Sequence, residues 1–212
     1  MKYKLIIITF IINTILFADM KQGFFATVHS ADIKTVQEYI TLGINIDLQD
    51  DKRRTALMIA MYKNDFKMAK LLIDNNADVN IQDNKFNSPF LYACEKGSVN
   101  MLKIMYEKAN TKNVFNIYGA NALMLACENG HLETTKFLLE NTDVDVNHVN
   151  NLSWTSLLEI TILGNDNSNY VQIVKLLLEH GADKTIKDKK GHDALYYAKA
   201  RGLTNIEKLL IQ

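Results

Sequence analysis

Residues 120–147 read ANALMLACENGHLETTKFLLENTDVDVN, and this stretch decides the fold. It carries two short apolar patterns at helical spacing, one over Leu123–Cys127 and one over Leu132–Leu139. Gly130 stands between them, and a glycine at such a place is typical of a helix that ends in a sharp turn. The stretch therefore predicts a helix-turn-helix unit followed by an extended segment.

The same unit recurs along the chain with a period close to 33 residues. Leu57, Phe90 and Leu123 are spaced by 33, and Leu157 and Leu195 follow after 34 and 38 residues. A degenerate first unit aligns on Phe24. The expected units are residues 22–49, 50–82, 83–115, 116–149, 150–187 and 188–212. Since one helix pair cannot bury its apolar face alone, the pattern predicts an all-α solenoid of stacked pairs.

The repeats resemble those of the ankyrin family, which has this period and a T-P-L-H-x-A motif. The matching stretches are Thr55–Ala60, Ser88–Ala93, Asn121–Ala126 and Asp193–Ala198. The resemblance covers residues 22–212 and implies helix-turn-helix units joined by β-hairpin-like loops, here called fingers. The family's histidine is absent from every unit. Its finger glycine remains only at Gly119 and Gly191, with Arg53, Phe86 and Ser153 at the other fingers.

The resemblance also implies a function, because ankyrin fingers and first helices together form a concave face that binds other proteins. It implies partner-binding residues at the variable positions of this face: Arg54, Tyr62, Lys85, Tyr118, Leu152, Trp154 and Ile162. Trp154, the only tryptophan, falls on a finger position that faces solvent in the family, and exposed Trp and Tyr are frequent hot spots. With Leu152 and Tyr118 it would form an apolar patch. Alternatively, the indole folds onto the adjacent finger and only stiffens it.

Composition and motifs argue against other classes of function. The 24 basic and 24 acidic residues give no net charge, whereas a nucleic-acid binder needs a basic field. No nucleophile–base set, phosphate-binding loop or metal-ligand spacing is found, so we expect no enzyme, no cofactor and no metal. The alternative of a small-molecule binder or enzyme would need converging polar groups that the sequence does not display.

The first 18 residues have the pattern of a secretory signal peptide. Lys2 and Lys4 precede the apolar run Leu5–Phe17, and Ala18 suits the position before a cleavage site. The run is shorter than the roughly 20 residues of a spanning helix. We therefore expect a monomeric periplasmic or secreted domain of residues 19–212. The alternative is an uncleaved leader that tethers the protein to the inner membrane.

Two roles fit an exported ankyrin protein. One is an accessory factor in periplasmic oxidative-stress defence, and the other is an immunity protein that binds a toxin or enzyme. The neutral charge favours the accessory role, because a protein steered onto a basic toxin is often strongly acidic.

Two further features have structural and functional interpretations. Cys94 and Cys127 occupy equivalent places in successive units. Stacked helices lie roughly 8–10 Å apart, beyond the reach of a disulfide, so we expect two small core residues and no bond; a redox or metal role is the alternative. The insertion Asn165–Asn169 predicts a solvated loop, with partner contact as the alternative.

Overall fold

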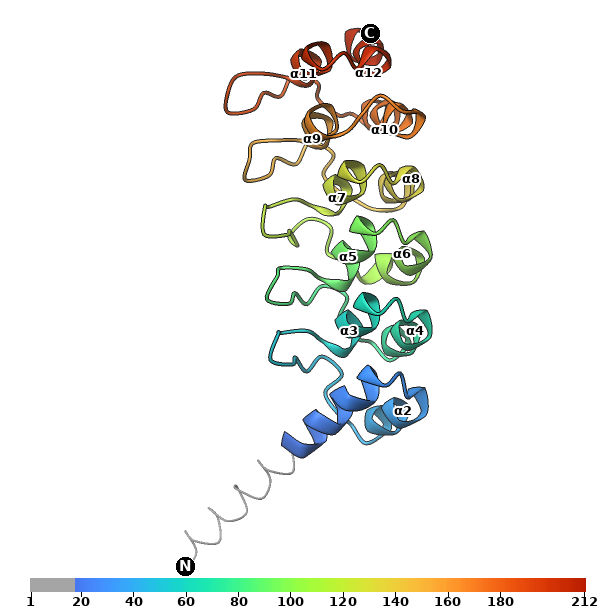
Figure 1. The fold of residues 1–212 in the computed structure, drawn as a ribbon. Helices are drawn as coiled ribbons and strands as arrows, with labels where there is room; N and C mark the ends of the chain where they lie inside the picture. The colour runs from blue at the N-terminus through green and yellow to red at the C-terminus, as the bar shows by residue number, and fades with distance from the viewer. Residues whose placement is uncertain (1–17) are drawn as a thin grey trace, which may run out of the picture. The chain divides into compact units, whose positions relative to one another are not determined.

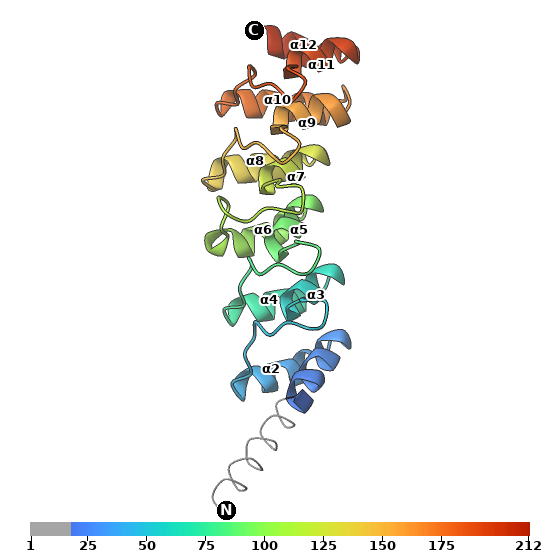
Figure 2. The ribbon, with the colours of Figure 1, turned by 90° about the vertical axis from the view of Figure 1, so that its left-hand side faces the viewer.

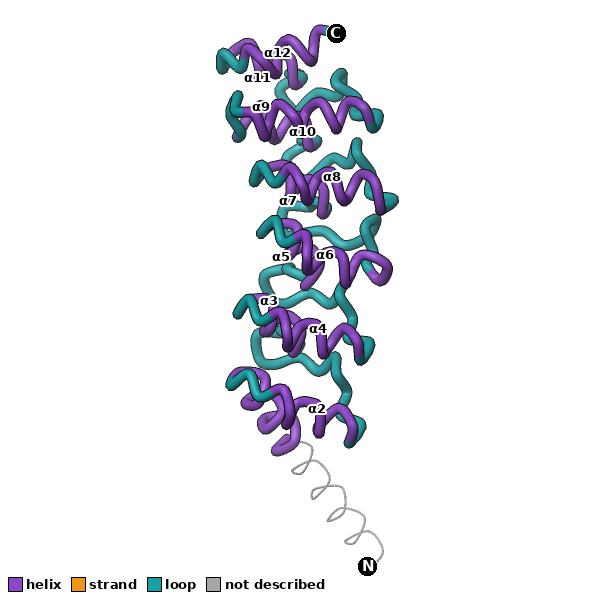
Figure 3. Tube along the Cα trace, turned by 90° about the vertical axis from the view of Figure 1, so that its right-hand side faces the viewer, coloured by secondary structure: helices purple, strands orange, loops and turns teal. Residues whose placement is uncertain are grey.

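The computed structural model describes residues 18–212, so the predicted leader falls outside it except for Ala18. Every regular element of the described residues is a helix, and Figure 3 shows no strand among them. The expected all-α fold of stacked helix pairs is confirmed. None of the helices within 18–212 is both long and apolar enough to cross a membrane. The contacts divide the chain after Asp83, and the two parts are described in turn.

The first part contains two helix pairs. A helix over residues 18–29 pairs with α2 (Ile33–Thr41), and α3 (Ala56–Tyr62) pairs with α4 (Phe66–Asp74). Its core is built from side chains that are fully or almost fully buried, among them Phe24, Val28, Val36, Leu57, Met58, Met68 and Leu72.

The second part contains four helix pairs. They are α5 (Pro89–Glu95) with α6 (Val99–Met105), α7 (Ala122–Glu128) with α8 (Leu132–Asn141), α9 (Ser156–Leu163) with α10 (Ser168–Glu179), and α11 (Ala194–Ala200) with α12 (Thr204–Ile211). A 3-10 turn, η1 (Tyr106–Lys108), extends α6. Figures 1 and 2 show the pairs following one another, with α5, α7, α9 and α11 in the inner layer. The finger loops project from this inner layer (Figure 1).

The first residue of each matching family stretch starts a helix, and Thr155 does the same in the fifth unit. Thr55, Ser88, Asn121, Thr155 and Asp193 are the N-caps of α3, α5, α7, α9 and α11. Each side chain accepts a hydrogen bond from the backbone N–H three residues later, over 2.8 to 3.4 Å. A cap of this kind satisfies an N–H group that has no partner within the helix. The motif therefore fixes where each inner helix begins.

The turn inside most pairs needs a left-handed residue. Gly97, Gly130 and Gly202 have φ near +66°, and Ala31 and Asn64 take the same conformation in the first part. The pair of α9 and α10 differs, because Gly164 is extended and the insertion follows it. The insertion is exposed except for Asp166, which is half-buried.

Asp166 holds the start of a helix 40 residues further along the chain. Its Oδ1 accepts from the backbone N–H of Ile206, and its Oδ2 accepts from the N–H of Asn205, both over 3.0 Å. Leu203, the N-cap of α12, makes no side-chain cap bond, so Asp166 performs that role from outside the helix. Burial alone would raise the pKa of Asp166, but these hydrogen bonds hold it below its ordinary value.

Cys94 and Cys127 are both fully buried, and neither forms a disulfide. Burial raises the pKa of both thiols, to about 12 for Cys127, although hydrogen bonds from Thr135 and Ser156 oppose the shift at Cys127. The thiolate is the reactive form of cysteine, so these residues act as small core side chains.

Candidate protein-binding face

Four of the fingers are closed by their own first residue. In the fingers 50–54, 116–120, 150–154 and 188–192, the first side chain accepts through Oδ1 from the backbone N–H groups two and four residues later. The first backbone N–H also donates to the carbonyl of the fifth residue, over 2.9 to 3.0 Å. These bonds make a hairpin-like loop whose shape does not depend on the side chains at positions two to four.

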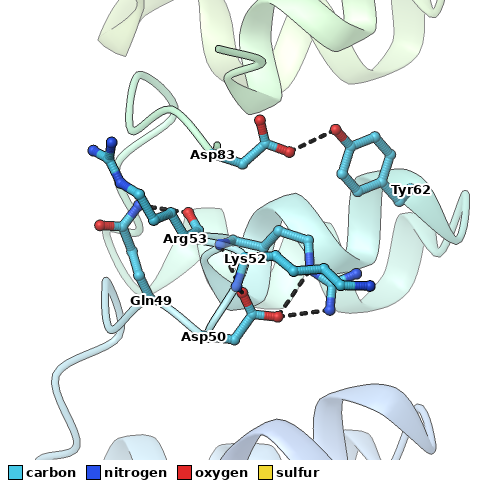
Figure 4. Close-up of polar contacts among 7 residues, drawn as sticks. Gln49, Asp50, Lys52, Arg53, Tyr62 and Asp83 are labelled. Atoms are coloured by element: carbon cyan, nitrogen blue, oxygen red, sulfur yellow. Dashed lines mark hydrogen bonds and ion pairs between the residues drawn. The ribbon is translucent and has the colours of Figure 1, made fainter. Parts of the chain in front are cut away.

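The fourth finger residue adopts a left-handed conformation with or without glycine. Gly119 and Gly191 have φ of +75° and +80°, while Arg53, Phe86 and Ser153 have φ between +57° and +63°. A non-glycine residue costs roughly 1–2 kcal/mol there. At Arg53, the Gln49 amide adds support by donating to the Arg53 carbonyl and to that of Gln82, the latter over 3.0 Å (Figure 4).

In the first part, the predicted contact residues Arg54 and Tyr62 are half-buried and already bonded. The Arg54 guanidinium donates to Oδ2 of Asp50 through Nε (2.8 Å) and Nη2 (2.6 Å). The Tyr62 hydroxyl donates to Oδ2 of Asp83 over 2.7 Å (Figure 4). Arg54 thus braces the finger 50–54, and Tyr62 holds Asp83, the last residue of the first part.

In the second part, two predicted contact residues lie exposed on neighbouring fingers. Tyr118 is 61% exposed and Leu152 is 44% exposed. The fingers are joined, since the Asn151 N–H donates to the Tyr118 carbonyl over 2.9 Å. Ile117, which was not among the predicted residues, is 59% exposed and lies beside Tyr118. We call Ile117, Tyr118 and Leu152 the apolar finger patch. The sequence could have indicated Ile117, because it and Tyr118 are two consecutive large apolar residues in a loop.

The remaining predicted residues of the second part are Lys85, Trp154 and Ile162. Lys85 is exposed at finger 83–87, while Trp154 and Ile162 are half-buried. Trp154 is therefore less accessible than its finger position implied. Its backbone N–H donates to Asn150 over 3.1 Å and helps to close the finger.

The apolar finger patch rests on a braced support. The rings of Phe115 and His148 stack with centroids 4.6 Å apart. Nε2 of His148 lies 2.6 Å from the Gly119 carbonyl oxygen, which can only accept, so the imidazole donates. Because the finger is fixed before any partner arrives, little ordering entropy would be lost on binding.

Three carboxylates lie on the inner helices of the same part. Glu159 of α9 is 4% exposed, and its Oε1 accepts from the Asn150 side-chain amide over 2.9 Å. Burial, followed by the charge of Glu128, raises the pKa of Glu159 to about 8, although the Asn150 bond opposes this. Glu128 on α7 is exposed, and partial desolvation of its carboxyl group, followed by the charge of Glu95, raises its pKa.

The exposed groups of this face are of the kinds that protein interfaces use. Within residues 18–212, no three His, Cys, Asp or Glu side chains converge as metal ligands would. Its apolar side chains can bind a partner by burying surface, its carboxylates by charge, and its finger backbone atoms by hydrogen bonding.

The stacked helix pairs and their projecting fingers define a helical-repeat protein with the architecture of a protein-binding module. The family model described as Ankyrin repeats (3 copies) matches residues 24–116, 70–150 and 109–188. The chain belongs to the ankyrin-repeat family, whose domains generally bind proteins and are typically non-catalytic.

Known proteins resemble the chain to different extents. The crystal structure of an ankyrin repeat domain from Acinetobacter baumannii AYE is 41% identical, with a TM-score of 0.85 over 90% of this chain and 97% of that one. The ankyrin repeat protein EF0377 is 39% identical, with a TM-score of 0.84 over 89% and 96%. The Escherichia coli K12 protein YahD is 43% identical over 35% of this chain, and Saccharomyces cerevisiae protein HOS4 is 44% identical over 30%. Those matches span only 37% of YahD and 6% of HOS4.

Proposed function

We propose that the protein is an exported interaction module that binds a partner protein through the apolar finger patch. The observation that carries this proposal is the exposure of Ile117, Tyr118 and Leu152 on two hydrogen-bonded fingers. Large apolar side chains held at a rigid surface supply the anchors from which a protein interface gains most of its affinity.

The test compares the proteins that three forms of the chain, the wild type and two variants, capture from the native host. Tyr118→Ser with Leu152→Ser removes two of the three side chains of the patch, one on each finger, while keeping both fingers, because neither side chain takes part in finger closure. The matched control is Ile211→Ser, which removes a side chain that is 60% exposed on α12. The wild type and the control should capture the same protein, and the double variant should bind it at least about tenfold more weakly.

If one protein is captured equally by all three forms, the partner binds at a surface other than the apolar finger patch. Failure of the wild type to capture any specific protein would contradict the proposal as a whole.

The export proposal rests on the pattern of Lys2, Lys4, the run Leu5–Phe17 and Ala18. N-terminal sequencing of protein from the native host should find a chain that begins at Asp19 in the periplasm or the medium. A chain that keeps Met1 in the membrane fraction would support the tethered alternative. A chain that keeps Met1 in the cytosol would contradict export.

Within this function, we propose the accessory role in periplasmic oxidative-stress defence. The balance of 24 basic and 24 acidic residues supports it over an immunity role. The captured partner distinguishes the two, since the accessory role predicts a periplasmic peroxide-removing enzyme. Capture of a secreted toxin would overturn the accessory role in favour of the immunity role.

A further inference from the structure

Three successive fingers present residues at equivalent positions, and the last of these residues is a cation. The third residues of the fingers are Tyr118, Leu152 and Lys190. In each finger the backbone N–H of this residue donates to Oδ1 of the first residue over 2.9 Å, so the three are displayed by loops closed in the same way. Tyr118 and Leu152 belong to the apolar finger patch, whereas Lys190 is exposed and carries a positive charge.

The cationic finger is bonded directly to the finger that carries Leu152. Nζ of Lys189 donates to the carbonyl oxygen of Asn151, the neighbour of Leu152, over 3.0 Å. The backbone N–H of Asn151 in turn donates to the Tyr118 carbonyl over 2.9 Å. Lys189 and Lys190 are both exposed. These hydrogen bonds join the three fingers, so the lysines and the apolar finger patch are parts of one accessible surface.

Acids beside the two lysines do not pair with them. Residues 184–201 contain six basic and two acidic residues. Both acids are engaged in the fold, since Asp188 closes the finger and Asp193 caps α11. Lys190 takes part in none of the ion pairs within the described chain. Lys189 uses one of the three donors of its ammonium group on Asn151, which leaves donors for a further acceptor.

We propose that the partner which covers the apolar finger patch carries an acidic side chain, aspartate or glutamate, beside its apolar anchor, and that Lys189 and Lys190 receive it. The proposal rests on the protein-binding function above and names the chemistry of the partner's binding segment. Ammonium groups bind a carboxylate through charge-assisted hydrogen bonds. An apolar anchor on the patch would exclude water beside these pairs, and complementary charges next to such an anchor add specificity.

A protein segment fits this surface better than another polyanion. Only one of the three joined fingers is cationic, and the other two present apolar and uncharged side chains. A nucleic acid is bound through an extended basic field, whereas this chain has no net charge. A short segment with an apolar residue next to an acidic one matches both parts of the surface.

The test selects binders to the immobilised protein from a library of short random peptides displayed on phage. The selected peptides should combine a large apolar residue with aspartate or glutamate close by, relative to the unselected library. Fluorescence anisotropy then measures the affinity of one labelled peptide. Lys190→Glu should weaken its binding about fivefold to tenfold, because repulsion replaces an exposed ion pair. Lys189→Gln, which keeps a donor for the Asn151 carbonyl, should weaken it about twofold to fivefold.

Lys208→Glu is the matched control, since it makes the same change of charge at an exposed lysine of α12, outside the fingers. The control should bind the peptide as the wild type does. Selected peptides without acidic residues, or equal binding by Lys190→Glu and Lys208→Glu, would overturn the proposal. So would a selection that enriches no peptide, or an oligonucleotide that binds the lysines more tightly than the selected peptide.

The proposed function can fail or stand separately. Apolar peptides that bind the wild type, and that lose binding only in Tyr118→Ser with Leu152→Ser, would keep the apolar finger patch and remove its acidic neighbour. An acidic peptide that binds this double variant as tightly as the wild type would overturn the proposal, because its acid would not depend on an apolar anchor. Native capture tests the patch without reference to the lysines.

Discussion

The Asn150 side chain connects a finger to a buried acid. Its Nδ2 donates to Oε1 of Glu159 over 2.9 Å, and its Oδ1 accepts from the backbone N–H groups of Leu152 and Trp154 over 2.9 and 3.1 Å. Asp stands at this position in the fingers that begin at Asp50 and Asp188. The finger thus accepts either residue, but only Asn can donate to Glu159.

We predict that Asn150→Asp lowers stability in a way that Asn116→Asp does not. Both variants keep the Oδ1 acceptor that closes the finger, but in Asn150→Asp the new carboxylate would face the Glu159 carboxyl group. Asn116 is followed nine residues later by Leu125, so its variant meets no acid at that place. The loss for Asn150→Asp should be about 1–3 kcal/mol at pH 8 and smaller at pH 5, where a carboxyl pair can hold a proton. Urea unfolding of the two variants measures this, and equal losses would count against the pairing.

Glu159 should make stability fall as the pH rises. Its pKa is about 8 in the folded chain, against about 4.3 for an unperturbed glutamate. The folded state therefore binds the proton more tightly. This contribution is fully present below the unfolded pKa and is lost as the pH rises through the folded pKa.

Glu159→Gln keeps an acceptor for Asn150 and removes this titration. Between pH 5 and pH 8, the variant should gain on the wild type by up to about 1.4 kcal/mol per pH unit. Urea unfolding at several pH values measures the difference, in which the titration of other groups cancels. Parallel stability curves for the two proteins would mean that Glu159 ionises normally in the folded chain.

Gly97 and Gly202 should differ in their tolerance of alanine although both have φ near +66°. A Cβ atom at Gly202 meets nothing within 4 Å, so Gly202→Ala should cost only the conformational penalty of about 1 kcal/mol. At Gly97 the added atom would lie 2.6 Å from Nδ1 of His131. That imidazole is held by a 2.9 Å hydrogen bond from Nε2 to the Glu95 carbonyl, so it cannot move freely.

Gly97→Ala should consequently cost about 1–3 kcal/mol more than Gly202→Ala, the range expected for overpacking. The double variant Gly97→Ala with His131→Ala removes the clash and should show less than the sum of the two single losses. Denaturant unfolding of the set measures the coupling. Additive losses would indicate that His131 moves aside at no cost.

Asp166→Ala should loosen the start of α12. The substitution removes the acceptor for the N–H groups of Asn205 and Ile206, and losing a helix cap costs about 1 kcal/mol. Hydrogen exchange should become faster at these two amides, while Asn169→Ala in the exposed start of α10 leaves them unchanged. Unchanged exchange in Asp166→Ala would mean that α12 holds its first turn without the insertion.

The period of the sequence predicted the helix pairs, because the spacing of buried residues and the caps at Thr55 and Asn121 are local properties. The exposure of Trp154 was harder to predict, since it depends on how the indole lies against its surroundings and not only on its place in the finger. Asp166 shows a second limit. Its partners lie 40 residues away, and no local pattern indicates that a polar insertion caps a later helix. The sequence analysis did not single out Glu159, because its burial and its hydrogen bond to Asn150 depend on how α9 packs against the finger 150–154.

In each of the fingers 116–120 and 150–154, one residue determines the shape of the loop and other residues form its exposed surface. Asn116 and Asn150 close their loops through backbone atoms, whatever side chain stands at Tyr118 or Leu152. Substitutions at these tips can therefore accumulate without disturbing the helices beneath. Recognition in this protein can change by single residues while the scaffold stays constant, so homologues with the same repeats can be expected to have different partners.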